Sequence, residues 1–561
     1  MAQPKKKKRK KLTPEQKARN AFNRLIRSTV ESIGFTERKA LRDRTVSYQG
    51  ETSDFDGVFV RENVVLIAEY TTRSKDISEH IKKKKTLYDK IVADNKSFVE
   101  HLSTLDDSFQ QSKLGHAPAQ CVVRVLYFSK NDVPNSTKSQ VPSVKCIDFG
   151  HVKYFESLGK TIRHAASYEF LEFLDIKQPD YAPTSSPGSK IYSGSLLPEA
   201  HSNFDDGYKI VSFYVDPAAL LSRAYVLRKD GWKDADGVYQ RMIEKKKVDS
   251  IRVYLRDKKR VFINNIIVTL SPATKIIDDQ GNTVDFSKIH KTTPVRIQVP
   301  DSFNSIGIID GQHRVFSYHE GGIADKSIAP LRNQQNLLVT GVVYPPNIDE
   351  ADRIKFEAQL FLEINSNQTN ARTDLKQAIQ QLTAPFSPEA IGRAIIEKLN
   401  NDSQPLSDKF ERYFYDSGKL KTSSIVSFGL KPLVKTSGAD SLFSVWPRSD
   451  KSDFIDSPTS ELKKDYVKFC FDEINKIFVA LQKHTPSEKW TADRSVEGRL
   501  LTTVVLNGML ITLRKVIAHN KPRSQSDYDK WLKDISKFDF GQYHSSQYNR
   551  LAEDLFEKHI K

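Results

Sequence analysis

Two acidic residues in the N-terminal third of the chain have the types and spacing to act together. Asp56 lies in a strand-like segment, residues 55–60, and Glu69 lies in a near-continuous apolar run, residues 64–71. A carboxylate within such a run is costly to bury without a partner. A hairpin over residues 55–71 brings Asp56 beside the face that carries Glu69. Two carboxylates at one strand end are a metal site of the kind Mg²⁺ prefers, and the ion can activate water and neutralise a scissile phosphate.

A lysine-rich segment follows this pair. The pattern predicts a single basic helix over residues 77–93, preceding a second buried strand at residues 121–128. Basic side chains on such a helix can contact a phosphate backbone, and a solvated face is the ordinary alternative. The candidate DNA contacts are Lys82, Lys83 and Lys85 of this helix, with Arg9 of the N-terminal lysine run.

The acid, hairpin and acid resemble the PD-(D/E)xK nuclease superfamily over about residues 15–130. Asp56 matches its first acid and Glu69 its second, and Glu31 on the preceding helix matches the glutamate that many members carry there. Thr71 departs from the pattern, because it stands where the lysine is expected. Lysines of the next helix, Lys84 above all, are candidates to replace it. The resemblance implies a restriction-endonuclease-like fold and Mg²⁺-dependent DNA cleavage. A turn at Asp56 and an edge charge at Glu69 are the structural alternative.

A second constellation lies at residues 305–321. An apolar strand ends at Asp310, Gly311 makes a turn, and a helix is expected over residues 312–320. A strand that passes through a tight turn into a helix leaves backbone N–H groups free to bind an anion. Arg314 can add paired hydrogen bonds to phosphate, and His313 can act as an acid or a base.

The string Asp310-Gly311-Gln312-His313-Arg314 is the signature of the DGQHR-domain family, which includes DndB-like proteins of DNA modification. Two further segments, residues 262–268 and 361–368, resemble that family's Asn-Asn strand and its Phe-x-x-Ile-Asn-x-x-Gln segment. The resemblance implies a ParB/sulfiredoxin-like fold, with a nucleotide or DNA-phosphate site formed by the five signature residues and bordered by Asn365 and Gln368. ATP or another NTP is the implied cofactor. Buried amides that tie loops to the backbone are the alternative for Asn365 and Gln368, and a structural ion pair is the alternative for Arg314.

The organisation expected from these patterns is α/β (α+β) with several parts. A basic arm at residues 1–14 precedes a nuclease-like domain at residues 15–175. A linker rich in proline and small polar residues follows at 176–199, then a DGQHR domain at 200–390. Residues 391–561 are expected to be helical, including a buried helix in the uncharged stretch 500–513.

Composition narrows the class of protein. The 561 residues hold 87 Lys and Arg against 70 Asp and Glu, a net charge of +17, which favours a nucleic-acid partner. Three cysteines at wide spacing argue against a disulfide framework, and neither a signal peptide nor a membrane span is expected. The expected location is cytoplasmic and associated with the nucleoid.

The sequence is compatible with three functions. The first is a DNA-binding protein of a modification or phage-defence system, which cleaves DNA at the first constellation and senses nucleotide or modified DNA at the second. The second is a non-catalytic DNA-binding transcriptional regulator, which the missing lysine at Thr71 favours. The third is an NTPase that uses Arg314. The oligomeric state is left open, a homo-oligomer included.

Overall fold

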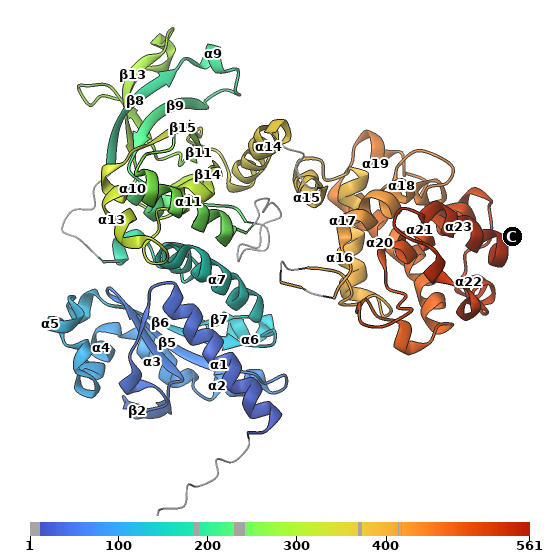
Figure 1. Ribbon diagram of the computed structural model, residues 1–561, viewed down its shortest axis with the longest axis horizontal. Coiled ribbons are helices and arrows are strands. Elements are labelled where there is room, and N and C mark those ends of the chain that lie inside the picture. The colour runs from blue at the N-terminus through green and yellow to red at the C-terminus, as the bar shows by residue number, and fades with distance from the viewer. Residues whose placement is uncertain (1–11, 183–189, 229–241, 369–372, 413–414, 417) are drawn as a thin grey trace, which may run out of the picture. The chain divides into compact units, whose positions relative to one another are not determined.

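The computed structural model describes residues 12–182, 190–228, 242–368, 373–412, 415–416 and 418–561. The described residues divide into two compact units, one that holds those up to 227 and those of 242–353, and one that holds those from 354 on together with Arg228. The first unit is mixed α/β, and the described part of the second is helical (Figure 1). The α/β class expected from the sequence is confirmed at this level. None of the described helices is long and apolar enough to span a bilayer.

The N-terminal part of the first unit is built on a five-stranded sheet in the order β1-β4-β5-β6-β7. Its strands are β1 (Thr36–Glu37), β4 (Gly57–Arg61), β5 (Val64–Thr71), β6 (Val122–Ser129) and β7 (Val144–Ile147). The hairpin β4–β5 is antiparallel, whereas β5, β6 and β7 run parallel. A fully buried central strand is the reason that the run from Val64 to Ala68 is apolar without alternation. The expected strand at residues 55–60 begins instead at Gly57, which leaves Asp56 in the preceding turn.

Helices cover this sheet on both faces. On one face lie α1 (Pro14–Ser32) and α7 (Phe149–Ile162), which pack against each other (Figure 1). The other face is covered by α2 (Ile77–Lys82), α3 (Lys85–Ala93) and α4 (Asn95–Leu105). The single helix expected over residues 77–93 is therefore wrong, because the chain breaks helical structure between α2 and α3. A short antiparallel pair, β2 (Thr45–Tyr48) with β3 (Glu51–Asp54), leads into the hairpin.

The rest of the first unit is an eight-stranded mixed sheet in the order β10-β14-β11-β15-β9-β8-β13-β12. Its strands are β8 (Lys190–Leu197), β9 (Lys209–Val215), β10 (Ala224–Tyr225), β11 (Ile266–Leu270), β12 (Lys275–Ile277), β13 (Thr293–Val299), β14 (Ile306–Asp310) and β15 (Leu337–Val343). It is accompanied by α9 (Glu199–Ser202), α10 (Pro217–Arg223), α11 (Lys245–Lys258), α12 (Gln312–Phe316) and α13 (Asp325–Gln334). The expected linker over residues 176–199 needs correction, because residues 190–197 form β8 between β9 and β13.

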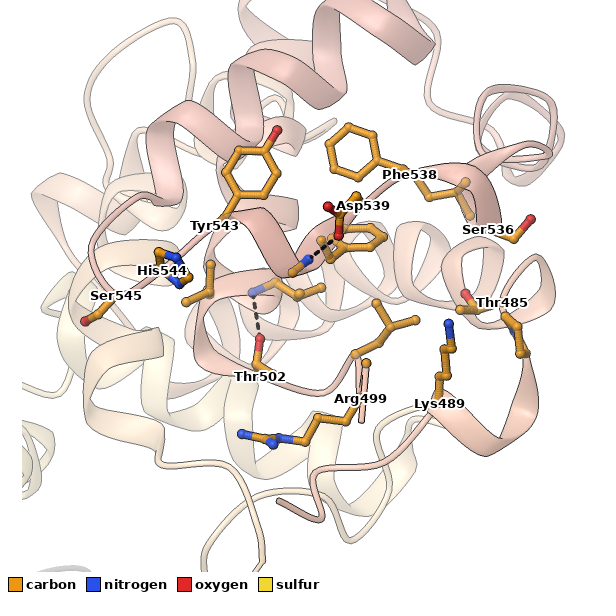
Figure 2. Close-up of a pocket in the computed structure, with 18 residues that line it drawn as sticks. Thr485, Lys489, Arg499, Thr502, Ser536, Phe538, Asp539, Tyr543, His544 and Ser545 are labelled. Carbon is orange, nitrogen blue, oxygen red and sulfur yellow. Dashed lines mark hydrogen bonds between the residues drawn. The ribbon is translucent and has the colours of Figure 1, made fainter. Parts of the chain in front are cut away.

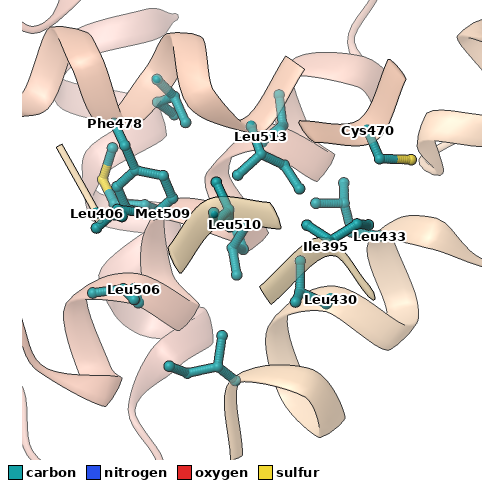
Figure 3. Close-up of a cluster of buried hydrophobic side chains, with 14 of the residues drawn as sticks. Ile395, Leu406, Leu430, Leu433, Cys470, Phe478, Leu506, Met509, Leu510 and Leu513 are labelled. Carbon is teal, nitrogen blue, oxygen red and sulfur yellow. The ribbon is translucent and has the colours of Figure 1, made fainter. Parts of the chain in front are cut away.

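The second unit is a helical assembly, as expected for the C-terminal region, but it begins earlier. It takes in most of α14 (Glu350–Gln368) and all of α15 (Thr373–Thr383), which were expected to belong to the preceding domain. Its core lies between α16 (Pro388–Asp402), α20 (Ser460–Lys483) and α21 (Thr503–Ala518). Figure 3 shows Leu510 of α21 in this core, with Ile395 of α16 and Cys470 of α20 among the surrounding side chains. The buried helix expected in the uncharged stretch is confirmed for residues 503–513.

Candidate functional site

Glu69 is a deeply buried acid of the candidate site. It lies on the central strand β5 and is 2% exposed. Alternation along the strand directs Glu69 to the face that α3 covers and Tyr70 to the face that α1 covers, where Arg27 lies over the Tyr70 ring. Tyr127 of β6 stands beside Glu69 in the parallel register. The structure therefore buries this carboxylate under a helix, in a position where it requires a partner.

Lys84 is that partner. It lies between α2 and α3, and its Nζ is 2.8 Å from each carboxylate oxygen of Glu69. The same ammonium donates to the backbone carbonyl of Asp54 at 2.9 Å and lies 3.2 Å from the Asp54 carboxylate. The structure thus brings a lysine to the second acid of the motif, although Thr71 stands at the expected sequence position. Because the helix breaks at Lys83 and Lys84, the side chain can turn in under the sheet.

Asp56 lies close to this ion pair. It sits in the turn before β4, and its Oδ2 accepts a hydrogen bond of 2.7 Å from the backbone N–H of Tyr70. Burial raises the pKa of Asp56, against the Tyr70 hydrogen bond and the charge of Lys84, both of which lower it. The hairpin therefore places Asp56 and Glu69 at the same strand end, as the sequence predicted.

The pKa values in the pair reflect burial and charge together. Burial raises the pKa of Glu69 to about 7, although the ammonium of Lys84 opposes the rise. Burial also disfavours a charged lysine, but the carboxylates of Glu69 and Asp54 outweigh it and raise the pKa of Lys84. Near neutral pH, Lys84 is therefore charged while Glu69 stands close to its titration point. Groups with pKa values near the working pH are suited to proton transfer and metal binding.

Three neighbouring residues were not identified from the sequence. Tyr88 of α3 is 1% exposed, and its hydroxyl has no hydrogen-bond partner among the described residues. Burial and the nearby Glu69 carboxylate raise the pKa of Tyr88. The hydroxyl of Tyr127 is 2.9 Å from Nδ1 of His80 on α2. Burial lowers the pKa of His80, and the charge of Arg73 lowers it further. The spacing of Lys84 and Tyr88, four residues apart and thus one helical turn, is the sequence signal that could have identified Tyr88.

The other residues predicted for this site have separate positions. Lys82 and Lys83 are exposed, and neither forms an ion pair within the described ranges. Lys85 pairs with Asp89 on its own helix. Glu31 is exposed on α1, and no hydrogen bond or ion pair in the described part of the chain joins it to Asp56 or Glu69. Glu31 needs correction as a site residue, because its side chain points to solvent. Arg9 lies outside the described residues.

The donor set limits how a metal ion can bind. Among the described residues, no group of three or more His, Cys, Asp and Glu is arranged to hold one. Asp56 and Glu69 provide two carboxylates. Mg²⁺ in phosphoryl-transfer sites is commonly held by one or two carboxylates, with water and substrate phosphate oxygens completing the shell. The pair therefore fits an ion that arrives with a phosphate substrate rather than one held in a preformed cage.

The second constellation follows β14. Asp310 ends the strand, and Gly311 has φ of 101°, a left-handed conformation that favours glycine. Arg314 donates to the Asp310 carboxylate at 3.0 Å and to the backbone carbonyl of Asn265 at 2.8 Å. Nε2 of His313 accepts a hydrogen bond of 3.2 Å from the backbone N–H of Glu244. Arg314 is thus held in place by the strand end, and its guanidinium is partly committed to the fold.

The turn after this motif is held by arginines that sequence reasoning missed. The helix α12 ends at Phe316 rather than near residue 320, so an anion site gains little from the dipole of so short a helix. Arg252 of α11 is 0% exposed and donates to four backbone carbonyls of the following turn, those of Ser317, His319, Gly321 and Ile323. Arg332 of α13 donates to the carbonyl of His319 as well. The signature segment therefore has a fixed base.

Asn365 and Gln368 belong to α14 in the second unit, whereas this loop belongs to the first unit. Asn365 lies on the part of α14 that belongs to the second unit, and it donates to the carbonyl of Phe361 on its own helix at 2.8 Å. This bond ties the Asn365 amide to the backbone, which is the structural alternative that the sequence left open for this residue. The side chain of Gln368 lies outside the described residues, as do residues 369–372 after it.

Comparisons of the chain with protein-family models, with curated proteins and with solved structures found no match. The resemblances to the PD-(D/E)xK and DGQHR families therefore stay predictions. The functional conclusion rests on the geometry of the residues themselves.

Proposed function

We propose that the N-terminal part of this protein hydrolyses phosphodiester bonds of DNA with Mg²⁺, using Asp56, Glu69 and Lys84. The observation that carries the proposal is the contact of Lys84 Nζ with both carboxylate oxygens of Glu69 at 2.8 Å, at the strand end where Asp56 also lies. An acid, a second acid and a lysine at one strand end are the residue types that metal-dependent phosphodiester cleavage requires.

Each residue has a distinct role in this proposal. Asp56 and Glu69 would hold the ion, which when bound supplies Lewis-acid stabilisation of the phosphate and a more acidic water. Lys84 keeps its positive charge through neutral pH and can donate to a phosphate oxygen or to the attacking water. Glu69 must be ionised to bind the ion, so its raised pKa makes activity increase with pH through about 7.

The surrounding surface is consistent with a DNA substrate. Lys82 and Lys83 are exposed beside Lys84 and are available for phosphate contacts along the backbone. The net charge of +17 favours such contacts over the whole chain. The resemblance to the PD-(D/E)xK superfamily supports the same reaction class.

The test is a Mg²⁺-dependent cleavage assay on modified and unmodified plasmid DNA with the full chain. Asp56→Asn, Glu69→Gln and Lys84→Met are each expected to lose cleavage by about a hundredfold or more. Lys90→Met is the matched control, because Lys90 lies on α3 but donates to the Gln49 carbonyl and Glu51 instead. Equal cleavage by the wild type and the three variants would reject the assignment. DNA binding without cleavage by any form would favour the non-catalytic regulator.

A second candidate function is nucleotide or modified-DNA sensing, with NTP hydrolysis as its enzymatic form, at residues 310–314. One observation favours it. The side-chain carbonyl oxygen of Asn265 is buried without a hydrogen-bond partner among the described residues, and the backbone carbonyl of the same residue holds Arg314. A buried acceptor without a partner beside a guanidinium is suited to a ligand that carries both a donor and an anion. Loss of phosphate release in Arg314→Ala would support the NTPase, and unchanged release would count against it.

A further inference from the structure

The second unit contains a pocket of about 540 Å³ that neither predicted site includes. It lies beside the start of α21, and its walls come from three parts of the chain: residues 485–489, 498–505 and 535–545. Figure 2 shows the labelled polar side chains around this pocket. Its volume lies in the range of about 300–1,000 Å³ that small-molecule sites have. This size admits a ligand of several functional groups rather than a single ion.

Two cations line the pocket without a carboxylate partner. Lys489 and Arg499 form no ion pair within the described ranges. The Lys489 ammonium lies beside Gly498, the residue before Arg499, where an added Cβ would be 3.6 Å from Nζ. Arg499 makes one hydrogen bond, of 3.3 Å, to the backbone carbonyl of Arg494. Asp493 of the same loop accepts hydrogen bonds from Ser495, and the charge of Arg499 helps to lower the pKa of its carboxyl. Lys489 therefore offers the pocket a cation without an ion-pair partner in the described part of the chain, which attracts an anion.

The opposite wall is aromatic. Phe538 and Phe540 are half-buried with ring centroids 5.0 Å apart, and Tyr543 lies parallel to Phe538 at 5.9 Å. The Tyr543 hydroxyl donates to Asp554 at 2.5 Å, which fixes this ring. Aromatic faces beside cations are the combination that proteins use to bind a phosphate and a stacked base together.

Asp539 adds an acceptor to the same wall. Its Oδ1 accepts a hydrogen bond of 2.9 Å from the backbone N–H of Gly541, and no described bond uses its other oxygen. A carboxylate here disfavours a ligand that is anionic throughout, but it can accept from a hydroxyl or an exocyclic amine. Thr502 lies on the floor, where its side chain caps the first turn of α21. The pocket thus has one cationic side and one side that is aromatic and acceptor-bearing.

We propose that this pocket binds a nucleotide, with the phosphate at Lys489 and Arg499 and the nucleoside against Phe538, Phe540 and Asp539. The phosphate supplies the charge that the two cations lack, the base supplies a flat apolar face, and the sugar or base supplies a donor for Asp539. The nucleotide can be free or part of a single strand, because both present the same groups.

The experiment is calorimetric titration of the full chain with AMP, with adenosine, with inorganic phosphate and with a six-nucleotide single strand. It is performed in an Arg314→Ala background, so that the other candidate nucleotide site does not contribute. AMP or the strand is expected to bind, with adenosine and phosphate at least tenfold weaker. Preference for AMP identifies a free nucleotide as the ligand, and preference for the strand identifies a nucleic-acid end or loop.

Two variants test the residues. Lys489→Glu changes an exposed residue, so we expect the fold to be retained, and Arg499→Ala removes the second cation. Each is expected to weaken AMP or strand binding at least tenfold. Lys483→Met is the control, because Lys483 pairs with Asp529 and does not line the pocket. The proposal is overturned if neither AMP nor the strand binds at millimolar concentration, if phosphate binds as well as AMP, or if Lys489→Glu binds like the wild type.

Discussion

The ammonium of Lys84 lies 2.8 Å from both carboxylate oxygens of Glu69, although the two residues are fifteen positions apart in the chain. The contact joins the central strand of the five-stranded sheet to the break between α2 and α3. It gives the buried carboxylate its only described ion-pair partner and keeps the lysine charged. The same contact fixes where a phosphate would have to lie if the proposed reaction is correct.

Neighbouring lysines should contribute differently to DNA binding and to DNA cleavage. Lys84→Met is expected to abolish cleavage while leaving DNA affinity within about threefold, because one buried charge contributes little to the counterion release that drives binding. Replacing both Lys82 and Lys83 with alanine should lower affinity and reduce the slope of log K against log salt by about 2 at most. Filter binding at several salt concentrations, beside the cleavage assay, measures both. A loss of affinity in Lys84→Met as large as that in the double variant would contradict the separation.

The pH dependence of stability should report the burial of Glu69. Its pKa is raised from 4.5 to about 7, so the folded state retains a proton that the unfolded state has lost. The stability from that proton is present below about pH 4.5 and is lost as the pH rises through about 7. The wild type should therefore lose up to about 3 kcal/mol relative to Glu69→Gln across this window.

Hydrogen exchange of the β5 amides at pH 4.5, 6 and 7.5 measures this difference locally. Glu100→Gln is the control, because Glu100 is exposed on α4 and contacts only Lys96 at 3.9 Å. If the protection of the β5 amides changes with pH in the same way in the wild type and in Glu69→Gln, Glu69 does not titrate in this range.

Removing the Tyr88 hydroxyl should raise the stability of the protein but lower its cleavage activity. Tyr88→Phe removes a buried polar group that has no partner among the described residues, so stability should rise by about 1 kcal/mol. Cleavage should fall by about tenfold, because the hydroxyl beside Glu69 is then absent from the site. Tyr528→Phe removes a buried hydroxyl of the same kind in the second unit and should stabilise without changing cleavage. Destabilisation by Tyr88→Phe would mean that the hydroxyl has a partner in solution.

Arg252 should be among the most sensitive positions for folding of the first unit. Arg252→Met leaves four buried carbonyl groups without their donor and should cost about 3 kcal/mol or more. Arg256→Ala, one turn further along α11, should be nearly neutral, because Arg256 is exposed and contacts its neighbour Asp257. Thermal unfolding measures the stability of the two variants, and hydrogen exchange of residues 317–323 measures how well the turn is protected in each. Similar losses in the two variants would show that the carbonyl contacts do not hold the turn.

The features that were predictable are those set by local patterning. The apolar run ending at Glu69 gave a central strand, and the placement of Asp56 followed from the hairpin. The break at Lys84 was not predictable, because the lysines have good helix propensity and no Gly or Pro interrupts them. A tertiary contact with Glu69 decides the local structure there.

The burial of Arg252 and the strand β8 were also not predicted, because contacts distant in the sequence determine both. Arg252 lies on a helix whose many charges resemble a solvated face, and its burial depends on carbonyl groups 65 to 71 residues away. The strand β8 resembles a linker because it holds Ser193, Gly194 and Ser195. Gly194 is required there by close packing, since an added Cβ would lie 2.3 Å from the Ser212 carbonyl oxygen. Small residues at a tight strand pair and small residues in a loop look alike in a sequence.

The break between α2 and α3 also limits how the chain length can vary. Ile77 and Ile81 anchor α2 in the core and so set the direction in which Lys84 leaves the helix. An inserted or deleted residue in the loop at 72–76 leaves this register unchanged and should be tolerated. The same change between Ile81 and Lys84 alters the position at which the lysine leaves the turn and carries it away from Glu69. Length variation among relatives of this chain should therefore be confined to the loop.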